Sequence, residues 1–434
     1  MSRQRVLLYR LNSFIRIFAV ITGLLVILGF SASPASASQP NLPGGGNYTS
    51  IAAAPNGGFW AQVHGDSGGQ TRTIAIDGAP AYESVNEVGS IAAIPGKNGY
   101  WVVTTGGNIH ARGEAPQLCG GRLQNCSGFS TGNGKHITAA AASPNGQGLW
   151  AVDSARHVWT AGNVVSYGDV TSDNRVPTGI AATPSGQGYY IVMDDGGVHA
   201  RGDAVFYGST GGNRPGGHDL VGIALSQDLA GEVDGYWLVG SDGGVHTFGN
   251  ATFLGSSGGG PGRGAISGIV ARPDGRSYAW VWKDGGVSKS QDSPPIVIKS
   301  PRDGNVIGVP NGSTEISADL KMETPNGSNA QKWKVVRAFA PDRSVLQLIN
   351  VNSNFCMDLE FAHVSAGIIQ HPCKPDGDNT NQLWNAVKVG SNWEFQSVEH
   401  KDYRLYGYPA EYGGGLIVSY YTNSGLDWNA IPTP

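Results

Sequence analysis

The sequence predicts an all-β fold with an N-terminal β-propeller followed by a C-terminal β-trefoil. Gly accounts for 66 of the 434 residues, and only 14% of residues are charged. Short apolar runs alternate with Gly, Pro, Asn and Asp, and two different tandem repeats follow each other along the chain. Gly costs about 1 kcal/mol against Ala inside a helix, and such turn residues between short apolar runs are typical of strands. We therefore expect short strands joined by tight turns.

The N-terminus has the organisation of a secretory signal peptide. Four arginines precede an apolar run at residues 18–30, and small residues follow up to Ala37. This order predicts a signal peptide at residues 1–37 and a secreted protein, either free or associated with the cell surface. The apolar run is shorter than the roughly 20 residues that a membrane span needs. We therefore expect no membrane span after cleavage, with an uncleaved anchor as the alternative.

The charge balance argues against nucleic acid as a partner. Acidic side chains number 33 against 29 basic ones, and four of the basic ones lie in the predicted leader. A protein that binds a polyanion usually carries a basic surface. No Cys/His set has the spacing of zinc ligands, so we expect no metal and no other cofactor. A monomer is expected.

The cysteines form two pairs that are close in sequence. An even number of cysteines at short separations in an exported chain favours the disulfides Cys119–Cys126 and Cys356–Cys373. Four cysteines allow three pairings, and free buried thiols are the remaining alternative.

One repeat of about 40–50 residues fills positions 38–293. Each unit has a small apolar run, a Gly-rich turn, an aromatic centre, an Asp-Gly-Gly turn and a further short run. Four extended segments in each unit predict four-stranded blades, and radial repetition of such units describes a propeller of about six blades. The central aromatic residues are Trp60, Trp101, Trp150, Tyr190, Trp237 and Trp280.

Most of the repeated residues have a structural explanation. We expect the aromatic residues to pack between blades, because burying such a ring is worth a few kcal/mol. His110, His199 and His246 recur at one position of the unit, which repetition explains better than a metal site. The last unit lacks an obvious fourth strand, and a strand donated from the segment before Tyr48 would close the ring.

A second, three-fold repeat begins after Pro294-Pro295 and covers residues 296–434. Its units centre on Trp333, Trp384 and Trp428, and the first two tryptophans belong to Gln-x-Trp motifs. Three units of about 40–50 residues predict the three lobes of a β-trefoil.

The middle lobe resembles the ricin B-chain lectin family in the order of its motifs. It contains Cys356-Met357-Asp358, a turn at Gly367, the run 368–373 ending in Cys373, and Asn381-Gln382-Leu383-Trp384. The resemblance implies a trefoil lectin whose cysteines are bridged within the lobe. The Gln and Trp of the Gln-x-Trp motif would hold the lobe together.

The resemblance also implies a carbohydrate site in this lobe. Asp358 would accept hydrogen bonds from two sugar hydroxyls and Asn381 would bond one of them, which suits an acceptor-only carboxylate and a bifunctional amide. His371 takes the place of the family's stacking aromatic residue. Gln370 stands next to the position where the family has a Gln, and Gln382 completes the candidate set.

The outer lobes depart from the family pattern. By sequence, Gly308 and Gly407 occupy the aspartate position, and Ala330 occupies the asparagine position of the first lobe. The third lobe carries a group of tyrosines that could stack on a glycan, namely Tyr406, Tyr408, Tyr412, Tyr420 and Tyr421.

These observations favour a secreted, non-catalytic carbohydrate-binding protein of the lectin or adhesin type. No nucleophile elbow or zinc-protease motif is present, so no catalytic residue is assigned. One alternative is a glycan-degrading enzyme, a glycoside hydrolase with a propeller catalytic domain, because the repeats contain acids such as Glu87, Asp203 and Asp234. The other alternative is a structural or protein-binding surface component.

Overall fold

The computed structural model describes residues 47–65, 70–171, 174–212, 215–257, 265–337, 345–360, 367–374, 380–408, 416–419 and 428–433. Almost all of the regular structure in these ranges is β-strand. No helix within them has the length and apolar character required to cross a bilayer. The predicted signal peptide lies outside the described residues.

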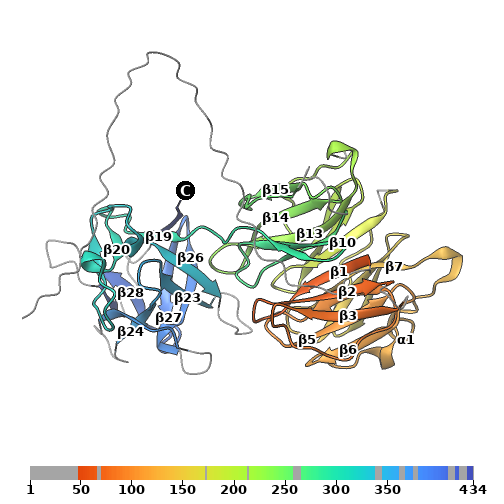
Figure 1. Ribbon diagram of the computed structural model, residues 1–434, viewed down its shortest axis with the longest axis horizontal. Coiled ribbons are helices and arrows are strands. Elements are labelled where there is room, and N and C mark those ends of the chain that lie inside the picture. The colour runs from red at the N-terminus through yellow and green to blue at the C-terminus, as the bar shows by residue number, and fades with distance from the viewer. Residues whose placement is uncertain are drawn as a thin grey trace, which may run out of the picture. The chain divides into compact units, whose positions relative to one another are not determined.

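The repeat domain consists of three-stranded antiparallel sheets, one for each sequence unit (Figure 1). The first three sheets are β1 (Asn47–Ala53), β2 (Phe59–His64), β3 (Thr71–Ile76); β4 (Gly89–Ala93), β5 (Gly99–Thr104), β6 (Ile109–Gly113); and β7 (Ile137–Ala142), β8 (Gly148–Asp153), β9 (Val158–Gly162). The next three are β10 (Pro177–Ala182), β11 (Gly188–Met193), β12 (Val198–Gly202); β13 (Leu220–Gln227), β14 (Val233–Gly240), β15 (Val245–Gly249); and β16 (Ile266–Ala271), β17 (Tyr278–Trp282), β18 (Val287–Lys289).

The first strands of successive sheets pack against one another in a propeller-like ring. β1 contacts β4, each later first strand contacts the next, and β16 contacts β1. The main-chain N–H of Tyr48 donates to the carbonyl of Lys283 at 3.0 Å, which links the first unit to the last. Ring closure in the described residues therefore uses β1 itself, and any donated strand before residue 47 lies outside them.

The expected fourth strand of each unit is not a strand. The segments at 206–208 and 253–255 form no ladder in the described structure. They follow the third strand and contribute carbonyl groups and side chains to the packing of their unit instead. The four-stranded prediction is thus corrected to three strands, because apolar composition marks a buried segment but does not guarantee a paired one.

The repeated tryptophans are buried between sheets, as expected. Trp60, Trp101, Trp150 and Trp237 are each at most 1% exposed. Their indole N–H groups donate at 2.8 Å to the carbonyls of the segment after the third strand, namely those of Pro80, Pro116, Val165 and Thr252. In the sixth unit the indole N–H of Trp280 is buried and has no partner among the described residues. The other units supply this carbonyl from the segment after the third strand, but in the sixth unit the chain passes into the C-terminal domain at that point.

This difference predicts unequal costs for two matched substitutions. Trp237→Phe removes a hydrogen-bonded donor and orphans a carbonyl, whereas Trp280→Phe removes a donor that is already unpaired. We expect Trp237→Phe to lower the free energy of unfolding by about 1–2 kcal/mol more than Trp280→Phe. Denaturant unfolding of the two variants measures the difference, and equal losses would show that the Trp280 N–H has an acceptor after all.

Both predicted disulfides are present. Cys119 and Cys126 pin the loop between β6 and β7, which holds the short helix α1 (Gln124–Ser127), and Cys356 is bonded to Cys373. No free cysteine remains.

The C-terminal domain is a trefoil whose described residues form twelve strands around one core. The strands are β19 (Ile296–Lys299), β20 (Val306–Gly308), β21 (Lys321–Glu323), β22 (Trp333–Arg337), β23 (Val345–Asn350), β24 (Cys356–Leu359), β25 (Ile368–His371), β26 (Trp384–Val389), β27 (Asn392–Ser397), β28 (Arg404–Gly407), β29 (Leu416–Ser419) and β30 (Asn429–Pro432). β30 pairs with β19, so the end of the domain returns to its beginning.

The three lobes repeat one buried interaction. Trp333, Trp384 and Trp428 are at most 2% exposed and belong to the same core. Their indole N–H groups donate to the carbonyls of Ile307, Met357 and Leu405 at 3.1, 3.2 and 3.2 Å. The bonds relate the lobes residue by residue, and they fix which positions of the three lobes are equivalent.

Candidate functional site

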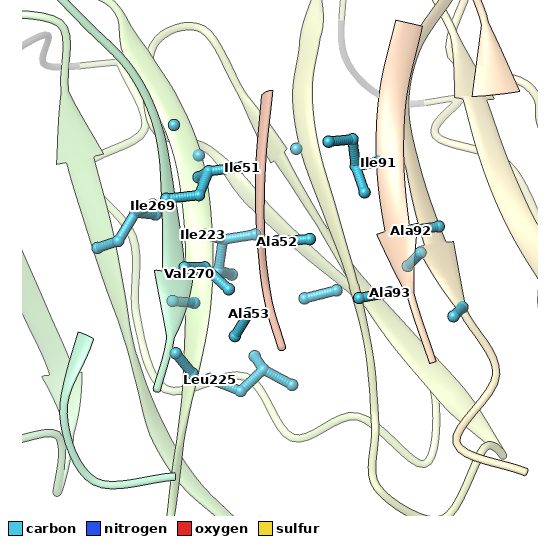
Figure 2. Close-up of a pocket in the computed structure, with 18 of the residues that line it drawn as sticks. Ile51, Ala52, Ala53, Ile91, Ala92, Ala93, Ile223, Leu225, Ile269 and Val270 are labelled. Carbon is cyan, nitrogen blue, oxygen red and sulfur yellow. The ribbon is translucent and has the colours of Figure 1, made fainter. Parts of the chain in front are cut away.

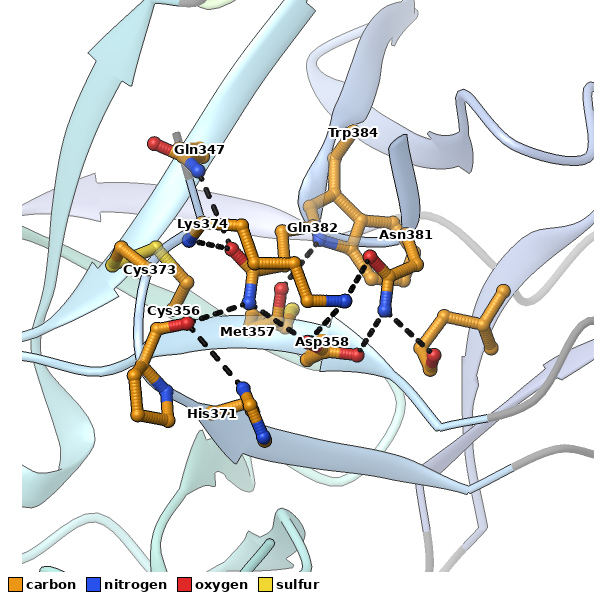
Figure 3. A network of polar contacts seen from close by, with 12 residues as sticks. Gln347, Cys356, Met357, Asp358, His371, Cys373, Lys374, Asn381, Gln382 and Trp384 are labelled. Carbon is orange, nitrogen blue, oxygen red and sulfur yellow. Dashed lines mark hydrogen bonds and ion pairs between the residues drawn. A yellow bond between two sulfur atoms is a disulfide. The ribbon is translucent and has the colours of Figure 1, made fainter. Parts of the chain in front are cut away.

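The middle lobe brings four of the predicted site residues together (Figure 3). Asp358 lies on β24, and His371 ends β25, which pairs with β24. Asn381 and Gln382 lie on a short 3-10 turn, η6 (Thr380–Gln382), directly before β26. The Cys356–Cys373 disulfide ties the start of β24 to the segment that follows β25. Side chains from the end of β25 and from η6 therefore lie around the Asp358 carboxylate of β24.

Both oxygens of Asp358 are held by amide groups. Asn381 Nδ2 donates to Oδ1 at 2.6 Å, and Gln382 Nε2 donates to Oδ2 at 2.8 Å. The Asp358 residue is only 3% exposed. Burial raises the pKa of this carboxyl above its ordinary value, and the Gln382 hydrogen bond and the Lys374 charge partly offset that rise.

The carboxylate still has acceptor capacity for a ligand. An ionised carboxylate offers about four lone-pair sites, and the two amides occupy two of them. The two amides therefore leave two lone-pair sites of the carboxylate without a partner from Asn381 or Gln382. The same two amides fix its orientation, so little reorganisation would be needed on binding.

Lys374 is a site residue that the sequence did not reveal. Its ammonium lies 2.9 Å from Asn381 Oδ1 and 3.9 Å from Asp358 Oδ2. Its main-chain N–H donates to Gln382 Oε1 at 2.8 Å, which anchors the residue beside the Asp358 carboxylate. The sequence feature that could have indicated this role is the position of Lys374 directly after Cys373. The positive charge compensates the buried Asp358.

Gln382 acts as a positioning residue. It is fully buried, and its Nε2 also donates to the Pro372 carbonyl at 3.0 Å. It thereby joins Asp358, the segment after β25 and the Lys374 main chain.

His371 ends β25, and its Nδ1 lies 3.4 Å from the Pro372 carbonyl. It is partly exposed, and its charge contributes to lowering the pKa of Asp358.

Gln370 points away from the Asp358 carboxylate. It is fully buried, its Oε1 accepts from Ser353 Oγ at 2.7 Å, and its Nε2 donates to the carbonyls of Ser313 and Glu315. It pairs with Met357 across the strands, while Ile369 pairs with Asp358. Because side chains alternate across a strand, Gln370 belongs to the opposite face, where it holds the loop of the first lobe.

In the first lobe, a carboxylate from a different strand takes the place of the missing aspartate. Val306 of β20 pairs with Glu323 of β21. A side chain at Gly308 would collide with the Glu323 carboxylate. Gln331 Nε2 donates to Glu323 Oε2 at 3.3 Å, in the way that Gln382 donates to Asp358. With Ala330 in place of the asparagine, this lobe has a carboxylate but lacks the second amide.

In the third lobe, Tyr406 rather than Gly407 corresponds to Asp358. The acceptor of the Trp428 indole is Leu405, equivalent to Met357, so the next residue is the aspartate equivalent. The rings of Tyr406 and Tyr408 meet edge to face at 5.2 Å, and Arg302 lies 5.1 Å from the Tyr406 ring. Tyr412, Tyr420 and Tyr421 lie outside the described residues.

The acids of the repeat domain are mostly engaged in turns. Asp195 Oδ1 and Asp242 Oδ1 accept the N–H groups two residues further on, each at 2.9 Å. Asp203 accepts from Thr183 Oγ1 at 2.8 Å, and Glu87 lies 3.3 Å from His110. Within the described residues, no three His, Cys, Asp or Glu side chains are grouped as metal ligands.

The pKa of Asp234, one of the acids named in the sequence analysis, is raised above its ordinary value. Burial is the main cause, the bond from Ser226 opposes it, and the charge of Asp228 adds to it. Ser226 Oγ donates to Asp234 Oδ1 at 2.8 Å.

Comparison with known proteins finds a family model that matches part of the C-terminal domain. Residues 277–371 match the model of the ricin-type beta-trefoil lectin domain-like family. No curated protein matches the chain.

Solved structures similar to parts of the chain include a designed three-fold symmetric protein, ThreeFoil, at 21% identity, covering 32% of this chain and 99% of that one with a TM-score of 0.29. The Rhizoctonia solani agglutinin is similar at 14% identity, with 33% and 98% covered and a TM-score of 0.29. An exo-beta-1,3-galactanase from Clostridium thermocellum is similar at 12% identity, with 88% and 95% covered and a TM-score of 0.30.

The family match joins the first lobe to the strand pair that carries Asp358, and the three equivalent Trp bonds extend the same architecture to the third lobe. Residues 277–371 of this chain therefore match the ricin-type beta-trefoil lectin domain-like family, and the C-terminal domain has a β-trefoil fold that follows a propeller-like repeat domain.

Proposed function

We propose that this is a secreted, non-catalytic carbohydrate-binding protein whose middle trefoil lobe binds a glycan through adjacent hydroxyls. The observation that carries the proposal is the Asp358 carboxylate, held by Asn381 and Gln382 with acceptor capacity to spare. His371 and Lys374 lie beside the same group of side chains and would contact the bound sugar from the side.

The proposed site is expected to bind weakly as a single copy. A shallow site that takes one sugar typically has a millimolar constant, which corresponds to about −4 kcal/mol. Useful retention on a polysaccharide would then need several copies or a second binding surface.

A glycan array probed with the purified protein in a multivalent format tests the proposal. We expect binding to a restricted set of glycans that is competed by the matching free monosaccharide. An array without any binding above background would favour the structural or protein-binding alternative.

The enzyme alternative has its own test. Glycosidases need two carboxyl groups about 5–10 Å apart, and the half-buried Asp234, whose pKa is raised by burial and by the charge of Asp228, is the acid of the repeat domain that we would test. Incubation with a polysaccharide panel should release no reducing sugar. Release that Asp234→Asn abolishes would replace the lectin proposal by a targeted glycosidase.

The pKa shift of Asp358 predicts that binding and stability respond to pH in opposite directions. Burial raises the folded-state pKa of this carboxyl above its ordinary 3.8. As pH falls through the raised value, the carboxyl gains a proton and loses acceptor capacity, so binding weakens at a pH where an ordinary Asp is still ionised. The stability penalty of burying the charge is fully present above the raised pKa and is relieved below it.

Glycan titrations and denaturant unfolding between pH 7 and pH 4 measure both responses. Asp358→Asn should remove the change in the free energy of unfolding with pH that this carboxyl causes. If binding and stability both stay constant until well below pH 3.8, the carboxyl is not shifted upward.

A further inference from the structure

Two cavities of the repeat domain differ in the groups that they offer to a ligand. The larger one, of about 350 Å³, lies among the first strands, and small aliphatic side chains such as Ala52, Ala92 and Ile223 line it (Figure 2). The two arginines of its lining, Arg272 and Arg337, are both hydrogen-bonded. The smaller cavity, of about 110 Å³, lies beside the disulfide-closed loop between β6 and β7 and has a polar lining.

The loop between β6 and β7 places polar side chains directly beside buried ones. Leu123 and Phe129 are at most 2% exposed and belong to the hydrophobic core of this unit. The residues next to these two anchors are exposed and line the smaller cavity, namely Arg122, Gln124, Ser130 and Thr131. The buried anchors therefore hold the main chain of the four polar residues in place.

The turn between β5 and β6 forms the opposite wall of this cavity. The main-chain N–H of Leu123 donates to the Gly107 carbonyl at 2.9 Å, and Asn108 forms a β-bridge with Arg122. Gly107 has a φ of +82°, and a Cβ there would collide with the Phe129 ring. Because glycine has no Cβ, the ring packs against the turn and brings the residues after it to the cavity.

The polar side chains of the lining are largely unused within the described residues. The guanidinium of Arg122, the amide of Gln124 and the hydroxyl of Thr131 make no hydrogen bond or ion pair there. Ser130 Oγ accepts the Gly132 N–H at 3.3 Å and keeps its own proton to donate. The lining therefore offers several hydrogen-bond donors and contains no carboxylate.

The acid that contacts the lining is already paired. Glu87 Oε2 accepts from Asn108 Nδ2 at 2.8 Å, and Oε1 lies 3.3 Å from His110 Nε2. Glu87 itself is not part of the lining. The positive charge of Arg122 is therefore without a counter-charge among the described residues that line the cavity.

We propose that this cavity binds a single oxyanion group, a sulfate, phosphate or carboxylate, independently of the trefoil site. The fork of an arginine matches two oxygens of such a group, and the amide and hydroxyls supply further donors. At about 110 Å³ the cavity is smaller than the usual sites for whole small molecules, about 300–1,000 Å³. It therefore takes one group, which is either a free anion or a substituent of a glycan.

An NMR titration of the full chain that follows the amide signals of Gly106 and Gly107 tests this site. The probes are sulfate, phosphate and acetate, with chloride at equal ionic strength as the reference. We expect at least one oxyanion to shift both signals with a saturable constant in the millimolar range. Arg122→Gln should weaken that binding at least tenfold, because it removes a charged hydrogen bond.

Lys135→Gln is the matched control, because it removes the same charge from the same loop at a residue that does not line the cavity. It should leave the constant unchanged, whereas Thr131→Val should weaken binding several-fold. Shifts that never saturate, that chloride reproduces, that persist in Arg122→Gln or that Lys135→Gln reduces equally would overturn the proposal.

Sugar-linked oxyanions distinguish the two sources of the group. Glucose 6-sulfate and glucuronate are compared with free sulfate and acetate, and glucose is the neutral control. Tighter binding of a sugar-linked group would assign the cavity to an acidic glycan, and equal binding would assign it to the free anion. Either result supports the oxyanion site, and shifts of the same size with glucose would contradict it.

Discussion

Replacing Asp358 by Asn is expected to weaken binding of the best array glycan by roughly 30- to 150-fold. The substitution keeps the size of the side chain but removes the charge and half of its acceptor capacity. Hydrogen bonds to a charged group contribute about 1.5–3 kcal/mol each, and a loss of 2–3 kcal/mol corresponds to that range of affinity. In addition, the new amide N–H would face Asn381 or Gln382, both of which donate to this position.

Glu323→Gln is the matched control for this experiment. Glu323 also accepts a hydrogen bond from the Gln of a Gln-x-Trp motif, but its lobe has Ala330 where the middle lobe has Asn381. Isothermal titration of both variants should show a large loss for Asp358→Asn and an unchanged affinity for Glu323→Gln. If both carboxylates affect binding equally, the ligand is not confined to the middle lobe.

Removing the Cys356–Cys373 disulfide is expected to lower the free energy of unfolding of the trefoil by about 3 kcal/mol. The bond closes a loop with a sequence separation of 17, and its main effect is to restrict the unfolded chain. The double variant Cys356→Ser/Cys373→Ser should also bind glycan less well, because the bond ties β24 to the segment that carries Lys374 and precedes Asn381.

The second disulfide separates these two effects. Cys119 and Cys126 are seven residues apart and lie in the repeat domain, so their removal should cost somewhat less stability, about 2.5 kcal/mol, and leave glycan affinity unchanged. Urea unfolding and titration of both double variants provide the measurement. A middle-lobe variant with unchanged affinity would mean that the disulfide does not position the site.

Features set by spacing along the chain were predictable from the sequence. The two disulfides, the buried repeat tryptophans and the three trefoil tryptophans all rest on local separations and apolar character. The three-stranded sheets were not predictable in the same way. The segments after β12 and β15 are apolar like strands, but they provide separate hydrogen bonds and ring contacts to the next unit, such as the Gly208 carbonyl that accepts from Tyr236 and the Leu254 N–H that donates to Tyr278. Whether such a segment joins a ladder depends on where the neighbouring strands lie.

Features set by which face a side chain occupies were missed. Gln370 stands one position from the family's glutamine, and a shift of one residue on a strand moves a side chain to the opposite face. The same shift separates Tyr406 from Gly407 in the third lobe. Glu323 comes from the strand paired with β20, and Lys374 from a segment joined by the disulfide, so both reach their places through tertiary structure.

The most direct test of the carbohydrate site is an NMR titration that follows the side-chain amide signals of Asn381 and Gln382. Gln331, which occupies the equivalent of Gln382 in the first lobe, serves as the internal control. With the best array glycan, the Asn381 and Gln382 signals should shift together and saturate with one dissociation constant, while the Gln331 signal stays in place. Shifts at Gln331 with unmoved Asn381 and Gln382 signals, or no saturable shift in any of them, would contradict a glycan site at Asp358.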